Sequence, residues 1–343
     1  MGEWAVVLAS NRPYHRNVVG YVVNTSSTCG ELLNQGEWGV INDPTVLVLG
    51  AGASVPYGFP SGRDLLLRIS ASLLGPNNPL ATNLMKCGYA FDELLSFRNE
   101  LYRSMQPSVD AFLENRREFI EIGKGAIAAE LIPFENEGRL CSREKDERWY
   151  EYLFKEICPG PSEFKNCHLK VITFNYDRSF EHFLFVALRS TFGFRDIEAA
   201  NFMKCIPIIH VHGQLGLLPY LNEKGRNFEP VVDPDSIRIA ASQIKIAHET
   251  SPEDIEFMSA REMIQSAANV CFLGFGYHPA NVQRLGFSEG FIRQHSDQRL
   301  MGSAYALMDA EKSRAENLFG GKIKLGLAVE DALAFLRRYP ILG

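Results

Sequence analysis

The sequence of 343 residues has only seven cysteines, and their spacing indicates neither a disulfide framework nor a zinc site. Their number is odd, and no two of them form a C-x-x-C pair. We therefore predict a cytoplasmic protein in a reducing environment, with no bound metal. The cysteines lie at positions 29, 87, 141, 158, 167, 205 and 271.

Long apolar runs and basic runs are also lacking. No stretch of about 18 apolar residues occurs, so no membrane-spanning helix is predicted, and residues 1–40 lack the basic start and apolar centre of a signal peptide. The formal net charge is -6 and no run of Lys and Arg is present, which argues against direct nucleic-acid binding. The 46% of hydrophobic residues can form the core of one large α/β domain with insertions, or of two modest domains.

The stretch from Thr45 to Asp64 predicts a strand, a glycine-rich turn and a helix in succession. Residues 46–49 form an apolar run typical of a buried parallel strand, and the small residues 50–54 follow it. Glycines in such a turn allow positive φ and a close approach of backbone N–H groups to an oxygen-rich ligand. Ser61 and the acid three residues later then predict a helix start. A tight turn without a ligand is the alternative interpretation.

This turn does not have the dinucleotide fingerprint of dehydrogenases. That fingerprint needs a third glycine or alanine near position 55 and an acidic residue about twenty positions beyond the turn. Val55 and residues 73–75 supply neither. The sequence therefore disfavours a dehydrogenase.

Apolar segments alternate with helical ones along the rest of the chain. This alternation predicts an α/β fold with a doubly wound, mostly parallel, Rossmann-like sheet, in which ligands bind beyond the carboxyl ends of the strands. Residues 1–42 are interpreted as an N-terminal arm of unassigned role, residues 43–343 as the main domain, and about 76–160 as a helical insertion. Residues 214–250 are expected to be rich in loops. Further strands are predicted at 169–174, 205–211, 269–273, 304–308 and 323–325, and helices after residue 177 and from Ser251, Ala310 and Val329.

Polar and glycine-rich motifs stand at the ends of four of these strands. They read GAGAS at 50–54, TFNYD at 173–177, HVHG at 210–213 and LGFGYHPAN at 273–281. Four such motifs in this order resemble the SIR2 (sirtuin) superfamily, and the resemblance covers roughly residues 45–340. The segment 58–63 also resembles the family's GIPDFR segment, although Gly62 stands where the family usually has phenylalanine.

The resemblance implies a role for each matching position. It implies that His212 is the catalytic base, because a positioned imidazole of near-neutral pKa can move a proton when the nicotinamide–ribose bond is cleaved. Two structural alternatives stay open: His212 as a core histidine satisfied by backbone, and Asn175 and Asp177 as caps of the next helix. The other implied roles are Gly50, Ala51, Gly52 and Ser54 at the pyrophosphate, Asn175 (catalytic) and Asp177 near the nicotinamide and its ribose, Gly274 and Gly276 at the adenosine half, Asn281 as a further cofactor-binding residue, and Arg63 at the family's arginine position.

One module of the protein-deacylating sirtuins is missing. Those proteins carry a four-cysteine zinc ribbon after the HG motif, whereas residues 214–269 contain no cysteine. The chain is similar instead to bacterial SIR2-like proteins of antiphage defence, which hydrolyse NAD and commonly act with a HerA-like ATPase, an Argonaute or another sensor. The resemblance thus implies a homo-oligomeric NAD glycohydrolase that releases ADP-ribose or a cyclic form. The alternatives are an NAD-dependent protein deacylase and a non-catalytic sensor that binds NAD or ADP-ribose.

Overall fold

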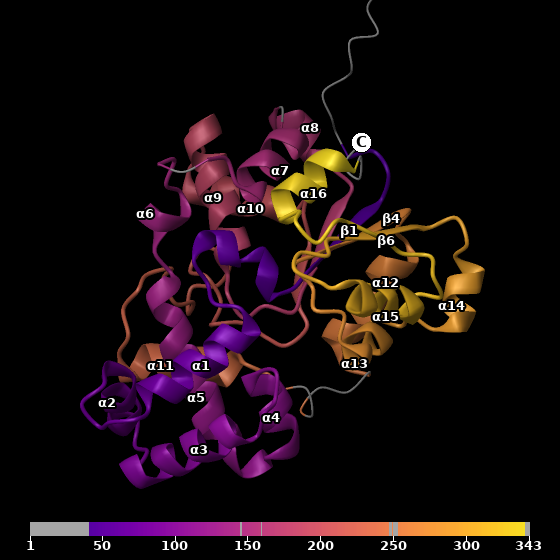
Figure 1. Ribbon diagram of the computed structural model, residues 1–343. Coiled ribbons are helices and arrows are strands. Elements are labelled where there is room, and N and C mark those ends of the chain that lie inside the picture. The colour runs from indigo at the N-terminus through magenta and orange to yellow at the C-terminus, as the bar shows by residue number, and fades with distance from the viewer. Residues whose placement is uncertain (1–40, 145, 159, 247–248, 250–252, 340–343) are drawn as a thin grey trace, which may run out of the picture. The chain divides into compact units, whose positions relative to one another are not determined.

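Six parallel strands form the central sheet of the protein (Figure 1). The computed structural model describes residues 41–144, 146–158, 160–246, 249 and 253–339. The strands are arranged in the order β3-β2-β1-β4-β5-β6. Their bounds are β1 Thr45–Leu49, β2 Leu169–Thr173, β3 Ile208–His210, β4 Asn269–Leu273, β5 Arg299–Gly302 and β6 Lys324–Leu325.

The strand order reverses at β1, which pairs with β2 on one side and with β4 on the other. Leu49 at the end of β1 is in register with Thr173 of β2 and with Leu273 of β4. In open α/β sheets a crevice for ligands forms beyond the carboxyl ends of the strands at such a reversal. The prediction of a Rossmann-like α/β fold is confirmed, and the fold directs attention to this end of β1.

The central strand is apolar throughout because both of its faces are covered. Side chains of successive strand residues point to opposite faces of the sheet. Leu47 and Leu49 accordingly belong to one buried cluster, and Val46 and Val48 belong to the other. All four residues are at most 3% exposed. Helices therefore cover the sheet on both sides, as the doubly wound arrangement requires.

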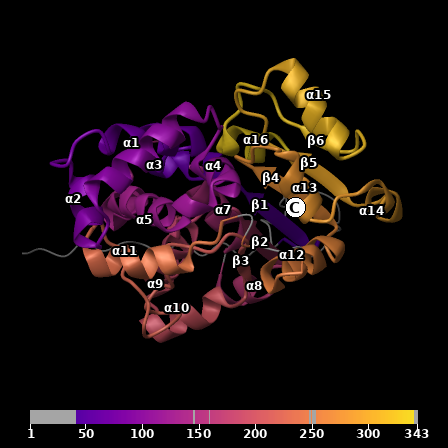
Figure 2. The same cartoon turned by 90° about the horizontal axis from the view of Figure 1, so that it is seen from below.

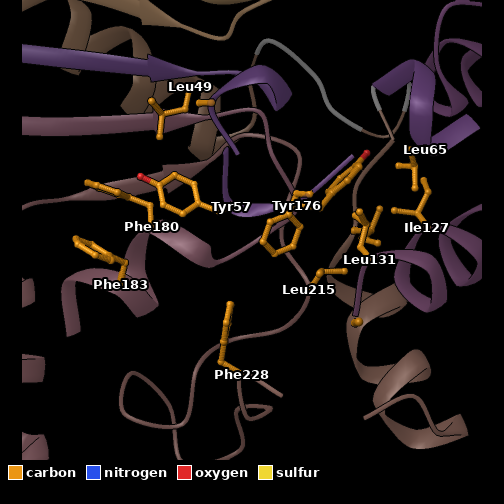
Figure 3. Packing of buried hydrophobic residues seen from close by; sticks show 14 of the residues in the cluster. Leu49, Tyr57, Leu65, Ile127, Leu131, Tyr176, Phe180, Phe183, Leu215 and Phe228 are labelled. Carbon is orange, nitrogen blue, oxygen red and sulfur yellow. The ribbon is translucent and has the colours of Figure 1, made fainter. Parts of the chain in front are cut away.

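The segment between β1 and β2 is almost entirely helical, as the sequence predicts for about 76–160. Figure 2 shows α1 to α5 gathered together, apart from β4 to β6 and α15. At the centre of this group, Leu65 of α1 lies close to Ile127 and Leu131 of α5 (Figure 3). The helices are α1 Gly62–Ser72, α2 Pro79–Lys86, α3 Phe91–Arg103, α4 Val109–Asn115, α5 Ile120–Leu131, α6 Glu137–Leu140, α7 Trp149–Ile157 and α8 Pro161–Lys165.

The second part of the chain completes both helical layers. Ser61 caps α1 as predicted, since its hydroxyl accepts from the amide of Asp64 at 3.2 Å. None of the helices in the described ranges is both long and apolar enough to span a bilayer. The later helices are α9 Ser179–Phe192, α10 Asp196–Met203, α11 Pro234–Gln243, α12 Ile255–Gln265, α13 Pro279–Arg284, α14 Glu289–Gln294, α15 Asp309–Leu318 and α16 Ala332–Arg338.

One prediction about secondary structure is wrong, and another is incomplete. The strand expected at 304–308 is β5 at Arg299–Gly302, and the chain turns after it through Ala306, whose φ is 59°. The region 214–250 contains α11, which Asp233 caps by accepting from the amide of Ser236 at 2.8 Å. Only Ile237 and Ala240 are buried on this helix, and two such positions form too short an apolar pattern to reveal it.

Two further predictions fall mostly or partly outside the described residues. Of the arm expected at 1–42, only Ile41 and Asn42 belong to the described part of the chain. The helix start expected at Ser251 also lies outside it. The described helix α12 begins at Ile255, directly after Asp254.

Candidate active site

The two glycine turns at the strand reversal pack directly against each other. The amide of Gly52 donates to the carbonyl oxygen of Gly274 at 3.0 Å, and the amide of Gly50 donates to that of Leu273 at 3.0 Å. A methyl group on Gly274, whose φ is +56°, would lie 2.0 Å from the amide nitrogen of Ala53. The glycines at 50, 52 and 274 are therefore needed for contact between two backbones, whether or not a pyrophosphate also binds there.

The other predicted contacts for the dinucleotide lie around this junction. Gly276 is exposed, and a methyl group placed on it would meet no atom within 4 Å. Asn281 is half-buried on α13. Arg63 is exposed on α1, and its guanidinium makes no hydrogen bond or ion pair with a described residue. All three residues are at least partly accessible to solvent, and their roles in ligand binding stay predictions.

A cavity of about 80 Å³ opens at the carboxyl ends of β1 and β2. It brings together four of the predicted site residues: Ala51, Ser54, Asn175 and Asp177. The wall is otherwise mostly apolar, a composition typical of sites for small organic ligands. Its remaining lining residues are Phe59, Pro60, Gly62, Leu65, Asp110, Leu131, Phe174 and Tyr176.

The carboxamide of Asn175 is held by two hydrogen bonds. Its Nδ2 donates to the carbonyl oxygen of Gly50 at 3.0 Å and to Oγ of Ser54 at 3.1 Å. A carbonyl oxygen can only accept, so the orientation of the amide is determined and Oδ1 is the atom left for a ligand. Asn175 does not cap α9, and that alternative is wrong. Instead it joins the end of β2 to the first glycine turn.

Asp177 makes the helix-start contact that the capping alternative assigned jointly to it and Asn175. Its Oδ1 accepts from the amide of Ser179 at 3.1 Å and also from the Ser179 hydroxyl, which lies 2.7 Å from the hydroxyl of Tyr150. Burial raises the pKa of the Asp177 carboxyl, and the hydrogen bonds from Ser179 and Ser54 oppose that shift. Asp177 therefore serves the start of α9 and faces the cavity at once.

Of the two histidines in HVHG, His210 has a structural environment. Its Nδ1 lies 2.8 Å from the carbonyl oxygen of Asn175, and its Nε2 contacts the carboxylate of Glu181. Burial lowers the pKa of His210, but Glu181 and the Asn175 carbonyl raise it more, so the net shift is upward. His210 thus connects the backbone at Asn175 to the carboxyl group of Glu181.

His212 has the opposite environment. The ring lies edge-on to Phe174 and Phe257, with centroid distances of 5.4 and 5.7 Å. Its Nδ1 is buried and has no hydrogen-bond partner among the residues that the structure describes, so the alternative of a histidine satisfied by backbone does not account for this atom. Burial, and secondarily the charge of Arg284, lowers the pKa of His212 to about 4. The imidazole is thus neutral at physiological pH.

His212 is not among the residues that line the cavity, but its ring contacts a residue that does. Phe174 stands directly before Asn175, lines the cavity and contacts the ring of His212. Of the predicted catalytic pair, Asn175 therefore lines the cavity, whereas His212 adjoins it through Phe174.

A buried network of ion pairs begins at the residue that follows Asp177. Arg178 follows Asp177 and is 0% exposed, as is its partner Glu135, whose carboxylate also pairs with Arg226. The guanidinium of Arg178 donates to four backbone carbonyls as well, which connects Glu135 of the insertion and the start of α9 to the loop after β3. These carbonyls belong to Gly216, Leu217, Arg226 and Asn227.

Three functional neighbours come from positions that the sequence analysis did not single out. Trp149 of α7 donates its indole N–H to the carbonyl oxygen of Ala53 at 2.7 Å, and Asp110 of α4 accepts from the hydroxyl of Tyr176 in the cavity wall. Tyr176 could have been predicted from the sequence, since it stands between two predicted site residues. Asp110 and Trp149 could not have been predicted, because no spacing rule relates an insertion to the strand ends it contacts.

The arrangement can hold a small polar ring and accept a proton. The cavity offers apolar walls with convergent amide, hydroxyl and carboxyl groups, and His212 is an unprotonated imidazole nearby. No group of three or more His, Cys, Asp or Glu side chains suited to a metal occurs in the described ranges. The chain matches no protein-family model and no curated protein.

Proposed function

We propose that the protein is an NAD glycohydrolase that converts NAD and water to nicotinamide and ADP-ribose or a cyclic form. The observation that carries the proposal is the cavity at the reversal of strand order, where Ser54, Asn175 and Asp177 converge. The wall residue Phe174 contacts the neutral, buried His212, whose Nδ1 has no partner among the described residues. The resemblance of the four strand-end motifs to the SIR2 superfamily supports NAD as the substrate.

The reaction follows from the chemistry of the groups present. The bond between ribose C1′ and the pyridinium nitrogen breaks, and its electron pair stays on the nitrogen, which leaves nicotinamide neutral. The oxygen of water bonds to C1′ and loses a proton to His212. The oxygen Oδ1 of Asn175 orients water or a ribose hydroxyl in this proposal. A positioned general base of this kind typically contributes about a hundred- to ten thousand-fold in rate.

The segment after the HG motif favours hydrolysis over deacylation. In this chain it contains α11, which packs against α5 of the insertion, and Ile244, which bridges to Gly213. A zinc ribbon that would support an acylated peptide has no cysteines here. Water is thus the proposed acceptor of the ADP-ribosyl group.

The biological setting of the proposal derives from the resemblance to antiphage-defence proteins. In that setting the protein is a cytoplasmic homo-oligomer that depletes NAD when infection is sensed. A HerA-like ATPase or another component of the defence system is the proposed partner.

Incubation of the purified protein with NAD tests the proposal. We expect release of nicotinamide and ADP-ribose without an acylated peptide, and loss of that release in His212→Ala. His168→Ala is the matched control, because His168 is exposed and precedes β2 at the opposite end of the strand. Release only when an acylated peptide is added would show a deacylase, and binding of NAD without any release, tested also with the partner, would show a sensor.

A further inference from the structure

Asn175, one of the two predicted catalytic residues, is connected to a buried pair of side chains outside the cavity of about 80 Å³. The pair consists of His210 at the end of β3 and Glu181 in the first turn of α9, and each side chain is only 7% exposed. Neither residue is part of the cavity wall that contains Ser54, Asn175 and Asp177. Any effect of the pair on a ligand must therefore act through a residue that the pair contacts.

The backbone of Asn175 is held on both sides of its side chain. Its amide donates to Oγ1 of Thr173 at 3.0 Å, and its carbonyl oxygen lies 2.8 Å from Nδ1 of His210. Thr173 and His210 are in register on the paired strands β2 and β3. The contact with His210 thus connects the residue that follows the end of β2 to the neighbouring strand.

Hydrogen bonds, more than close packing, determine where the carboxamide of Asn175 points. Besides the larger cavity, Asn175 lines a second cavity of about 10 Å³, which Glu181 and Tyr150 also border. Its side chain is therefore not enclosed by close packing on every side. The carboxamide donates to the carbonyl of Gly50 and the hydroxyl of Ser54, so a shift of the Asn175 backbone would change both bonds and redirect Oδ1.

The two partners of His210 determine where the hydrogens of the pair lie. A carbonyl oxygen only accepts, so Nδ1 of His210 carries a hydrogen and donates it to Asn175. Nε2 contacts the carboxyl group of Glu181, and one proton lies between them, either on the ring or on the carboxyl group, because two bare acceptors would repel each other. In both forms Glu181 holds the ring in the orientation in which Nδ1 faces Asn175.

We infer that His210 and Glu181 are positioning residues, which orient Asn175 for its part in cleaving NAD. The inference rests on the proposed function and concerns the same site. A misplacement of about 1 Å in a group that orients a reactant can cost about a hundredfold in rate. Loss of the bond to Asn175 should therefore lower kcat for nicotinamide release and leave the KM for NAD almost unchanged.

The test replaces the histidines of two neighbouring buried His–Glu pairs by glutamine. Nε2 of glutamine lies as many bonds from the backbone as Nε2 of histidine, so His210→Gln keeps a donor for Glu181 and loses the donor for the carbonyl of Asn175. His182→Gln is the matched control, because His182 is buried on α9 and its Nε2 lies 2.8 Å from a carboxylate oxygen of Glu137. We expect kcat to fall about tenfold or more in His210→Gln and to stay within about twofold in His182→Gln, with KM within about twofold in both.

Glu181→Gln is a second test, which does not depend on the folding of His210→Gln. The glutamine amide can donate to Nε2 of His210, so Nδ1 keeps its hydrogen and its bond to Asn175. A positioning role therefore predicts a kcat within about threefold of the wild type. A loss of about tenfold or more in a stably folded Glu181→Gln would show that the reaction needs the ionisable group itself, and would overturn the inference.

NMR of the full chain tests the positions without turnover. In protein with isotope-labelled histidine and asparagine, we expect a hydrogen on Nδ1 of His210, and side-chain amide signals of Asn175 that shift in His210→Gln and not in His182→Gln. An Nδ1 without a hydrogen would overturn the inference.

Kinetics and NMR together separate the inference from the proposed function. If the wild type cleaves NAD and a stably folded His210→Gln keeps its kcat, or loses no more than His182→Gln, the inference is overturned and the proposed function stands. If the wild type cleaves no NAD, with or without the partner, the proposed function fails and the NMR signals decide whether the pair positions Asn175. A shift confined to His210→Gln supports that role, and unchanged Asn175 signals overturn it.

Discussion

Gly52 and Gly274 touch through their backbones, and this contact joins the two strands at which the sheet reverses its order. The amide of Gly52 donates to the carbonyl oxygen of Gly274 at 3.0 Å, and a methyl group on Gly274 would lie 2.7 Å from Cα of Gly52. Neither turn can shift without displacing the other.

Gly274→Ala should destabilise the protein by more than about 3 kcal/mol, since the new methyl group meets backbone atoms at a positive φ. Gly276→Ala is the control, because that position has open space and should change the free energy of unfolding by less than about 0.5 kcal/mol. Urea unfolding of both variants measures the difference. Equal stability of the two would contradict the packing described here.

The pKa of His212 predicts a distinct dependence of stability on pH. Its folded-state pKa of about 4 lies below the ordinary value of 6.5, so the unfolded chain takes up a proton first as the pH falls. The wild type should lose stability on this account between about pH 6.5 and pH 4, by about 3 kcal/mol in total. His212→Ala lacks this loss, so the stability difference between the two proteins should shrink toward low pH. A pH-independent difference, measured by urea unfolding against His168→Ala as control, would show that His212 is not buried in its neutral form.

Asn175 should tolerate neither alanine nor aspartate. Asn175→Ala removes the amide that donates to the hydroxyl of Ser54 and one of the two donors to the carbonyl of Gly50, which also accepts from the amide of Ala53, at a cost of about 1–3 kcal/mol. Asn175→Asp should cost at least as much, because a carboxylate faces that carbonyl. Asn115→Asp is the matched control: its exposed amide donates to the carbonyl of Ala111 at 3.1 Å, and we expect a change below about 0.5 kcal/mol. An Asn175→Asp variant of full stability, together with wild-type turnover of NAD, would refute both the bonding and the catalytic role.

Loss of the buried carboxylate of Glu135 should destabilise the protein far more than loss of an exposed carboxylate. Glu135→Gln leaves the guanidinium groups of Arg178 and Arg226 buried without a counter-charge and should cost about 3–5 kcal/mol. Glu198→Gln breaks an exposed pair with Arg195 and should cost at most about 1 kcal/mol. Thermal unfolding of the two variants in parallel makes the comparison. Similar melting temperatures would mean that the network does not stabilise the loop after β3.

The sequence predicts the strands of this fold well because they are apolar on both faces. The apolar run at β4 matched its observed bounds, Asn269–Leu273, and the cap at Ser61 was read correctly from local spacing. The helix α11 was missed because its pattern is weak, although Asp233 and Pro234 mark its start. Local sequence patterns therefore predicted secondary structure correctly where burial requires a regular alternation of residue types.

The candidate site was predictable only in part. Ser54, Asn175 and Asp177 converge as expected, because the carboxyl ends of neighbouring parallel strands meet at one edge of a sheet. Asp110 and Trp149 come from the insertion, and tertiary packing alone brings them there. The glycines were expected to approach a ligand, whereas those at 50, 52 and 274 approach one another.

The meeting of Gly52 and Gly274 also sets the order in which the site can be assembled during synthesis. The ribosome releases β1, the insertion and β2 long before β4, so the first turn has no backbone partner in a partly made chain. Contacts between such distant positions form late because the long loop between them must first be closed. A nascent or prematurely truncated chain that ends before β4 therefore lacks half of the junction. We therefore expect the candidate site to be completed only after β4 has been made.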